Sequence, residues 1–172
     1  MWPVLVLAWA SLFFWGWQAV DRYLPVRVPR KRLAPLGVYD EVRQPTGPVS
    51  LRLKRLGEVR LAGVAAPEGD SARLDLAGRL RELAPPGTPV YAEPEWTHAD
   101  GGEAGRASVY LCPPAARSGR PFPYEQATLV GAVLVREGWA RVDRLTPYRY
   151  RSEFLMLEDE ARRHRRGLWK SP

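Results

Sequence analysis

The first feature of the hydrophobic pattern is an uncharged run over residues 2–20. A helix of about nineteen residues spans roughly 28 Å, which is close to the thickness of the hydrocarbon core of a bilayer. Trp2 lies at one end of the run and Trp15 and Trp17 lie near the other, as in the aromatic belts of membrane proteins. The pattern predicts one transmembrane helix at residues 1–20 that anchors the chain in the cell membrane.

A cleaved signal peptide is the alternative interpretation of this run. It requires a basic segment before the apolar one, whereas only Met1 and Trp2 precede the run here. We therefore expect an uncleaved single-pass anchor, with secretion as the alternative.

The segment at residues 21–36 is expected to be a basic, Pro-rich juxtamembrane linker. Its cations are Arg22, Arg27, Arg30, Lys31 and Arg32. Because positively charged flanks stay on the cytoplasmic side, the folded part is expected in the cytoplasm. The same cations attract anionic headgroups, so the membrane is one predicted partner.

Beyond residue 36 the pattern changes to short stretches in which apolar and polar residues alternate, as in half-buried strands. Residues 49–53 alternate cleanly, and residues 59–66 form a second strand whose faces are both expected to be covered. Pro67 ends that strand because it has no N–H to donate, and residues 48–65 together predict a hairpin. Two further strands are predicted at residues 89–93 and 106–111.

Three helices are predicted from apolar residues at helical spacing. They lie at residues 72–83, at residues 126–137, and from Ser152 to the basic run at 162–166. Ser71 is the expected N-cap of the first, and Gly138 is expected to end the second. The Pro-rich residues 112–124 are predicted to form a surface loop, and residues 139–142 a short extended piece.

Composition limits the classes of function. The net charge is +7, but residues 21–32 carry five basic residues against Asp21 alone and account for more than half of it. The folded part, expected at residues 37–172, is therefore only mildly cationic, and the total charge alone does not indicate a nucleic-acid surface. A single cysteine, Cys112, excludes an internal disulfide, and together with 2 histidines it argues against a zinc site.

Candidate chemistry begins at Arg60 and Glu68, at opposite ends of one short run. A guanidinium offers a planar fork of donors to phosphate, and a carboxylate orients or deprotonates a water molecule. The alternative is a surface arginine and a turn glutamate. The run at residues 162–166 likewise has two interpretations, a complement to the helix dipole or a phosphate-binding patch.

Several motifs in order resemble the staphylococcal nuclease (thermonuclease) family. They are RLAGVAAPE at residues 60–68, GRASVY at 105–110, LVREGWARV at 134–142, EDEAR at 158–162 and GLW at 167–169. The resemblance covers about residues 47–170. It implies an α+β fold, mainly β: a five-stranded OB-type barrel with about three helices, here preceded by the transmembrane helix.

The resemblance implies three site residues, Arg60, Glu68 and Arg106. The two arginines are expected to neutralise charge on the phosphate, and Glu68 to position or deprotonate the attacking water. The family also holds a calcium ion through two aspartates, but here Ala65 replaces one, and residues 45–48 contain no carboxylate in place of the other. Calcium takes six to eight oxygen ligands, so no metal site and no cofactor are expected.

Three functional hypotheses follow. The first is a membrane-tethered domain that binds nucleic acid or nucleotide through phosphate, with calcium-dependent phosphodiester hydrolysis impaired or lost. The second is an active nuclease with altered metal use. The third is a protein-interaction module that uses the OB barrel only as a frame.

Overall fold

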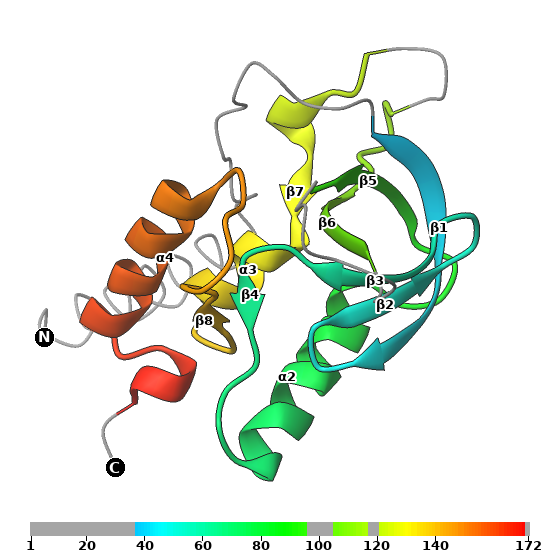
Figure 1. The fold of residues 1–172 in the computed structure, drawn as a ribbon. Helices are drawn as coiled ribbons and strands as arrows, with labels where there is room; N and C mark the ends of the chain where they lie inside the picture. The colour runs from blue at the N-terminus through cyan, green and yellow to red at the C-terminus, as the bar shows by residue number, and fades with distance from the viewer. Residues whose placement is uncertain (1–36, 96–104, 117–120, 171–172) are drawn as a thin grey trace, which may run out of the picture.

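The computed structural model describes residues 37–95, 105–116 and 121–170. Five of its strands form a closed barrel (Figure 1). They are β1 (Val38–Gly47), β2 (Ser50–Leu53), β3 (Gly57–Leu61), β5 (Pro89–Pro94) and β6 (Gly105–Leu111). The strand order is β3-β2-β1-β5-β6, and a parallel pairing of β3 with β6 closes the sheet on itself. This arrangement confirms the predicted five-stranded OB-type barrel.

Three helices accompany the barrel in the described part of the chain, as predicted. They are α2 (Asp70–Leu83), α3 (Val130–Arg136) and α4 (Arg151–Arg163). In Figure 1, α2 lies below the barrel, and α3 lies between the barrel and α4. Almost all of α3 is buried, so this short helix joins the barrel to α4. Smaller elements complete the order: β4 (Val64–Ala65), η1 (Tyr124–Gln126), β7 (Thr128–Leu129) and β8 (Arg141–Val142), followed after α4 by η2 (Gly167–Trp169).

The alternation of β2 and β3 decides which side chains enter the barrel. Leu51 and Leu53 are buried whereas Arg52 between them is exposed, and β3 repeats the pattern around Arg60. Burying a leucine side chain contributes about 1.5–3 kcal/mol, so a register shift that turned these leucines outward would be costly. The same register that buries the leucines therefore places Arg60 on the outer surface.

The predicted strand at residues 59–66 is in fact two strands, which corrects both its length and its expected burial on two faces. The chain bends after Leu61, and Gly63 adopts φ +75°, a conformation that glycine accepts readily. The Tyr148 ring occupies the place where a Cβ of Gly63 would lie. After the bend, β4 leaves the barrel and pairs with β8, Val64 opposite Val142.

Three other local predictions need correction. The sequence pattern does not predict β1, because Asp40 and Glu41 interrupt its apolar positions. The helix predicted from residue 126 begins at Val130, after η1 and β7. The helix expected to be capped by Ser71 begins at Asp70 and has Gly69, at φ +89°, at its N-cap position.

The Pro-rich stretch at residues 112–124 is not only a surface loop. Phe122 is buried, and its ring stacks on Tyr91 with centroids 4.2 Å apart. The apolar surface that the aromatic ring removes from water explains why this part of the loop folds inward.

The predicted anchor at residues 1–20 and linker at residues 21–36 lie outside the described residues. Among the helices that the structure does describe, none is both long and apolar enough to cross a membrane.

Candidate phosphate-binding site

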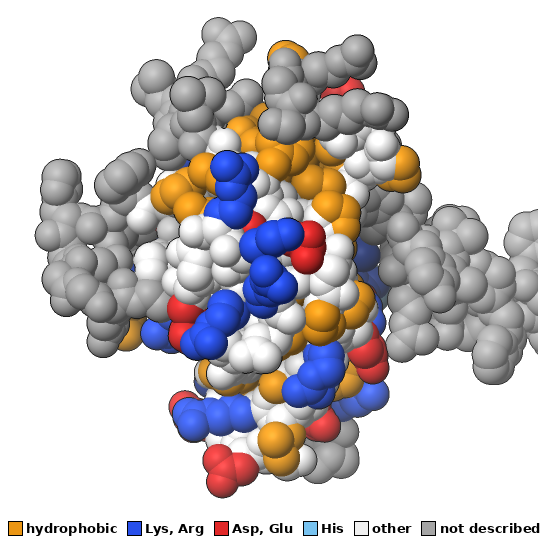
Figure 2. Space-filling view, turned by 90° about the vertical axis from the view of Figure 1, so that its right-hand side faces the viewer, with side chains coloured by type: hydrophobic (Ala, Val, Ile, Leu, Met, Phe, Trp, Pro, Cys, Tyr) orange, Lys and Arg blue, Asp and Glu red, His pale blue; other side chains and the backbone are white. Residues whose placement is uncertain are grey.

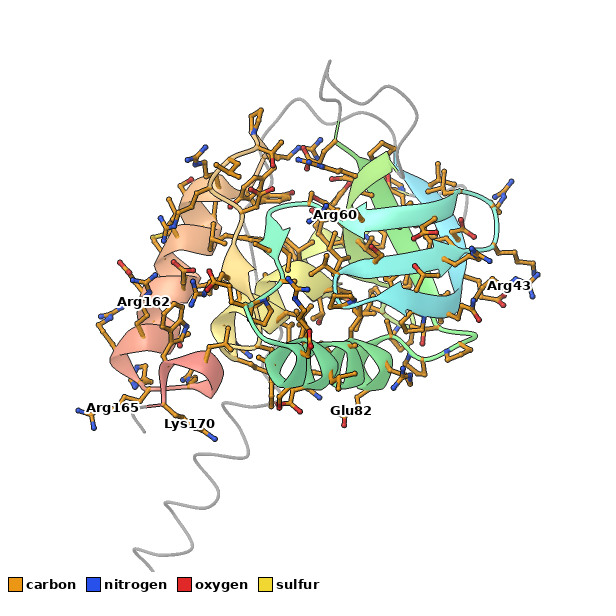
Figure 3. The ribbon with its side chains drawn as sticks, turned by 60° about the horizontal axis from the view of Figure 1, so that its bottom comes forward. Arg43, Arg60, Glu82, Arg162, Arg165 and Lys170 are labelled. Carbon is orange, nitrogen blue, oxygen red and sulfur yellow. The ribbon has the colours of Figure 1, made fainter. Side chains whose placement is uncertain are left out.

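Arg60 and Arg106 are neighbours across the strand pair that closes the barrel. In the parallel ladder of β3 and β6, Arg60 is the register partner of Arg106. Paired strands lie about 4.8 Å apart, and residues in register point to the same face of a sheet. The residues that flank Arg60 are buried, so both guanidinium groups belong to the outer face. Figure 3 shows Arg60 where β3 leaves the barrel for β4.

The two arginines differ in solvent exposure and in ion pairing. Arg60 is exposed, and within the described residues it forms no ion pair. The Arg106 side chain is only 23% exposed, and its Nη1 atom lies 3.8 Å from Oδ2 of Asp143. The site therefore combines one solvent-exposed guanidinium with one that a neighbouring charge restrains.

Asp143 is a site residue that the sequence analysis did not identify. It directly follows β8, and its backbone N–H donates to the Gly63 carbonyl at 3.0 Å, which fixes it beside the bend between β3 and β4. Its carboxylate accepts hydrogen bonds from the Leu145 N–H at 2.9 Å, from the Thr146 N–H at 3.3 Å and from the Thr146 hydroxyl.

These contacts determine the ionisation of Asp143. Partial burial opposes ionisation, but the Thr146 hydroxyl, the two backbone N–H groups and the charge of Arg106 outweigh it and lower the pKa of the carboxyl group below its ordinary value. Asp143 therefore stays negatively charged in mildly acidic solution. No signal in the sequence distinguished it from other loop aspartates, because its role depends on the pairing of β4 with β8.

Glu68 lies in the exposed loop between β4 and α2. A hydrogen bond from α2 holds this loop in place, since Arg73 Nε donates to the Pro67 carbonyl at 3.1 Å. Among the described residues no ion pair joins Glu68 to Arg60 or Arg106. The structure thus places the two arginines on neighbouring strands and leaves Glu68 exposed in the turn after β4.

A buried charged cluster lies on the strands next to Arg106. Glu93 on β5 is fully buried and accepts hydrogen bonds from Arg149 and from the Tyr124 hydroxyl. Glu95 accepts a 2.8 Å hydrogen bond from Ser108 Oγ, and its own N–H donates to the Arg106 carbonyl at 2.8 Å. Because buried charges need partners, this cluster fixes the β5–β6 end on which Arg106 stands.

The positions that the resemblance assigns to calcium offer no carboxylate in the described part of the chain. Ala65 lies in β4 and the turn at residues 45–48 lacks carboxylates, while Asp40 uses its oxygens to accept from the Arg55 and Leu56 N–H groups. The described residues contain no group of three or more His, Cys, Asp or Glu side chains that could hold a metal ion.

Figure 2 shows several Lys and Arg side chains (blue) along the middle of the barrel face, with fewer Asp and Glu side chains (red) beside them. Along β1–β3, Arg52 Nη2 lies 3.7 Å from Glu58 Oε2, and Lys54 Nζ lies 3.7 Å from Glu41 Oε2. Exposed pairs of this kind contribute little to stability, and they neutralise only part of the charge on these strands, since Arg43 and Arg55 are also exposed. Arg60 is thus one of several exposed cations of the barrel, and its register with Arg106 is what distinguishes it.

Comparison with protein families matches residues 99–171 to the model of the staphylococcal nuclease homologues. The match covers less than half of the chain. It includes Arg106, Asp143 and the helices α3 and α4, but not Arg60 or Glu68. No significant match to a curated protein was found. Together with the five-stranded barrel and its three helices, the match supports a relationship to the staphylococcal nuclease family.

Proposed function

We propose that this protein binds phosphate groups of nucleic acid or nucleotides between Arg60 and Arg106 and hydrolyses phosphodiesters slowly or not at all. The supporting observation is the register of the two arginines on β3 and β6. Two planar donor forks on neighbouring strands match the oxygens of one phosphate. The restrained Arg106 provides a fixed point of attachment, and the free Arg60 closes on the ligand.

Hydrolysis needs more than this pair of cations. A water molecule must be oriented and deprotonated, and Glu68 is the candidate base because it follows β4 on an exposed loop. Without a metal ion and the carboxylates that would bind it, several kcal/mol of transition-state stabilisation are absent. We therefore propose that binding is retained and that cleavage is weak.

The test is to measure oligonucleotide affinity of the full-length chain by fluorescence anisotropy. Arg60→Gln and Arg106→Gln are each expected to weaken binding about tenfold, since a charge-assisted contact contributes roughly 1.5–3 kcal/mol. Arg43→Gln is the matched control because Arg43 is an exposed cation on the other side of the barrel (Figure 3). Equal affinity of all four proteins would refute the proposed site.

Cleavage is measured in parallel with calcium, with other divalent ions and with EDTA. We expect little turnover in each condition. Rapid calcium-dependent cleavage would contradict the proposal.

A second candidate function is phosphodiester hydrolysis that does not need calcium. It is favoured by Asp143, an ionised carboxylate 3.8 Å from Arg106, which adds a second acidic group near the phosphate position. Cleavage in EDTA that is lost in both Asp143→Asn and Glu68→Gln would support this candidate. EDTA-resistant cleavage that survives both substitutions would exclude these two carboxylates as its source, and loss of all cleavage in EDTA would exclude the candidate function itself.

We also propose, from the apolar run at residues 2–20 and the basic residues behind it, that the domain is tethered to the membrane. The proposal concerns residues outside the described part and rests on the sequence alone.

A further inference from the structure

The end of α4 contains an arginine in a conformation that normally selects glycine. The Arg165 N–H donates to the Arg162 carbonyl at 3.0 Å, and the Arg166 N–H donates to the Ala161 carbonyl at 2.9 Å. This pair of bonds is the Schellman motif, whose left-handed position is usually glycine. Here that position is Arg165, at φ +50°, and it is the one described non-glycine residue with positive φ. Its Cβ makes the conformation sterically unfavourable.

The turn that follows Arg165 is held rigidly against the end of α3. The Leu168 N–H donates to the Gly138 carbonyl at 2.8 Å. A Cβ on Gly138 would overlap the Arg166 carbonyl oxygen, and one on Gly167 would overlap the Gly138 oxygen. Two glycines thus allow the two backbones to lie in contact, which attaches the turn to the end of α3.

Trp169 strengthens this attachment. Two guanidinium carbons lie near its ring, that of Arg162 at 4.2 Å and that of Arg141 at 5.6 Å from the ring centroid. Cation–π contacts of this kind link η2 to α4 and to β8. The backbone that carries the cations of the turn is therefore anchored to α4 and β8.

The cations of this region fall into two groups. Arg162 pairs with Glu158 at 3.1 Å and Arg166 pairs with Glu160 at 2.8 Å, so these two serve the fold. Arg163, Arg165 and Lys170 are exposed, and no ion pair within the described residues neutralises them. We call these three the C-terminal basic turn. In Figure 3, Arg165 and Lys170 project outward from it, well apart from Arg60.

We propose that the C-terminal basic turn is a second contact for the phosphate backbone of a nucleic-acid strand, separate from Arg60 and Arg106. The inference rests on the proposed function, since it extends the binding of the same polymer. The helix dipole explains cations in the last turn of α4, but it explains neither a strained Arg165 where glycine is preferred nor Lys170 beyond the helix. Unpaired cations on a rigid support match a polymer with regularly spaced charges.

An anionic membrane is the less favoured partner for this surface. Interfacial segments usually insert exposed apolar side chains next to their cations. On the turn, Leu168 and Trp169 are instead partly buried, so it presents charge without an apolar wedge.

The test compares two double variants of the full-length chain. Arg165→Gly with Lys170→Gln removes two cations from the turn. Arg43→Gln with Arg55→Gln removes two exposed cations from the barrel side. Affinity for a fluorescent single-stranded oligonucleotide is measured as a function of salt. The turn variant is expected to bind about tenfold more weakly, and its salt slope to become shallower by roughly 1.4, about 0.7 for each lost phosphate contact. The control is expected to change little.

Melting temperature separates binding from folding. Glycine relieves the left-handed strain at position 165, so the turn variant is expected to melt at or above the wild-type temperature. Weaker binding that accompanies a large loss of thermal stability would overturn the inference. Equal weakening in the control would overturn it as well, because net charge alone would then explain the effect.

Two further outcomes separate this inference from the proposed function. Phosphatidylserine vesicles serve as the second ligand, and a turn variant that loses vesicle binding but keeps oligonucleotide affinity would overturn the inference in favour of a membrane. If the turn variant weakens oligonucleotide binding while Arg60→Gln and Arg106→Gln do not, the turn is a binding surface and the proposed site fails. A wild-type chain that binds no oligonucleotide would refute both.

Discussion

Asp143 restrains Arg106 without occupying its hydrogen-bond donors. Three hydrogen bonds within its own turn use the oxygens of the carboxylate, so its approach to Arg106 stops at 3.8 Å, beyond hydrogen-bond distance. A short, bidentate ion pair would compete with a phosphate for the same donors. The turn around Asp143 therefore favours ligand binding by keeping the arginine in place and its donors available.

Asp143→Asn tests this role through the pH dependence of stability. A carboxyl group whose pKa is lowered in the folded state stabilises the fold above its unfolded pKa, near 3.8, and this contribution is lost as the pH falls through the folded pKa. The free energy of unfolding of the wild type is expected to exceed that of the variant by roughly 1–2 kcal/mol at pH 6. This difference is expected to shrink below about pH 4. Urea denaturation at several pH values measures it. A difference that does not depend on pH would contradict the assignment.

The candidate site residues were predicted from two kinds of sequence information, a local pattern and the family resemblance. Arg60 and Glu68 were found from one short stretch, and Arg106 from the family resemblance. That Arg60 and Arg106 are register partners follows from a parallel ladder between distant strands, which no local pattern specifies. Asp143 was missed for the same reason, since the pairing of β4 with β8 alone brings it beside the site.

At the scale of elements, the bend between β3 and β4 sets the geometry of the site. Gly63→Ala is expected to destabilise the protein by about 2 kcal/mol or more, because φ is +75° and the Tyr148 ring occupies the position of the new Cβ. Displacement of the bend is also expected to weaken phosphate binding, since Asp143 hydrogen-bonds to the Gly63 carbonyl.

Gly78→Ala is the matched control for this substitution. Gly78 lies within α2, and no atom lies within 4 Å of the position that a Cβ would occupy there, so alanine is expected to stabilise the helix by about 0.5–1 kcal/mol. Chemical denaturation of both variants and anisotropy measurements make the comparison. If Gly63→Ala were as stable as the wild type, the bend would not have the role assigned to it.

The elements that the sequence predicted well are those with uninterrupted patterns. Alternation located β2, and short apolar stretches with continuous burial located β5 and β6, each to within one or two residues. It failed at β1, where Asp40 is polar because it caps the Arg55–Leu56 turn rather than because it faces solvent along the strand. It also failed at residues 59–66, where apolar composition continues through a bend that only the positive φ of Gly63 reveals.

For the whole molecule, the distribution of charge matters more than its total. The net charge of +7 does not by itself indicate nucleic-acid binding. Most of the excess positive charge belongs to residues 21–32, and part of the charge on the barrel wall is paired. The unpaired cations of the described part include Arg60 and those of the C-terminal basic turn, which lie apart in Figure 3. A longer oligonucleotide that reaches both is therefore expected to bind more tightly than one that reaches a single site.

The last prediction concerns where the molecule resides. If residues 2–20 remain attached as an anchor, the full-length chain stays in the membrane fraction after washing with high salt and alkaline carbonate, which remove proteins held only by charge. The cations between Arg22 and Arg32 favour the cytoplasmic side for the domain, so protease added to intact cells is expected to leave it uncut. Replacing those cations with glutamine serves as the control and is expected to weaken the orientation. Digestion from outside, or a mature chain that begins after residue 20, would instead establish export of the domain.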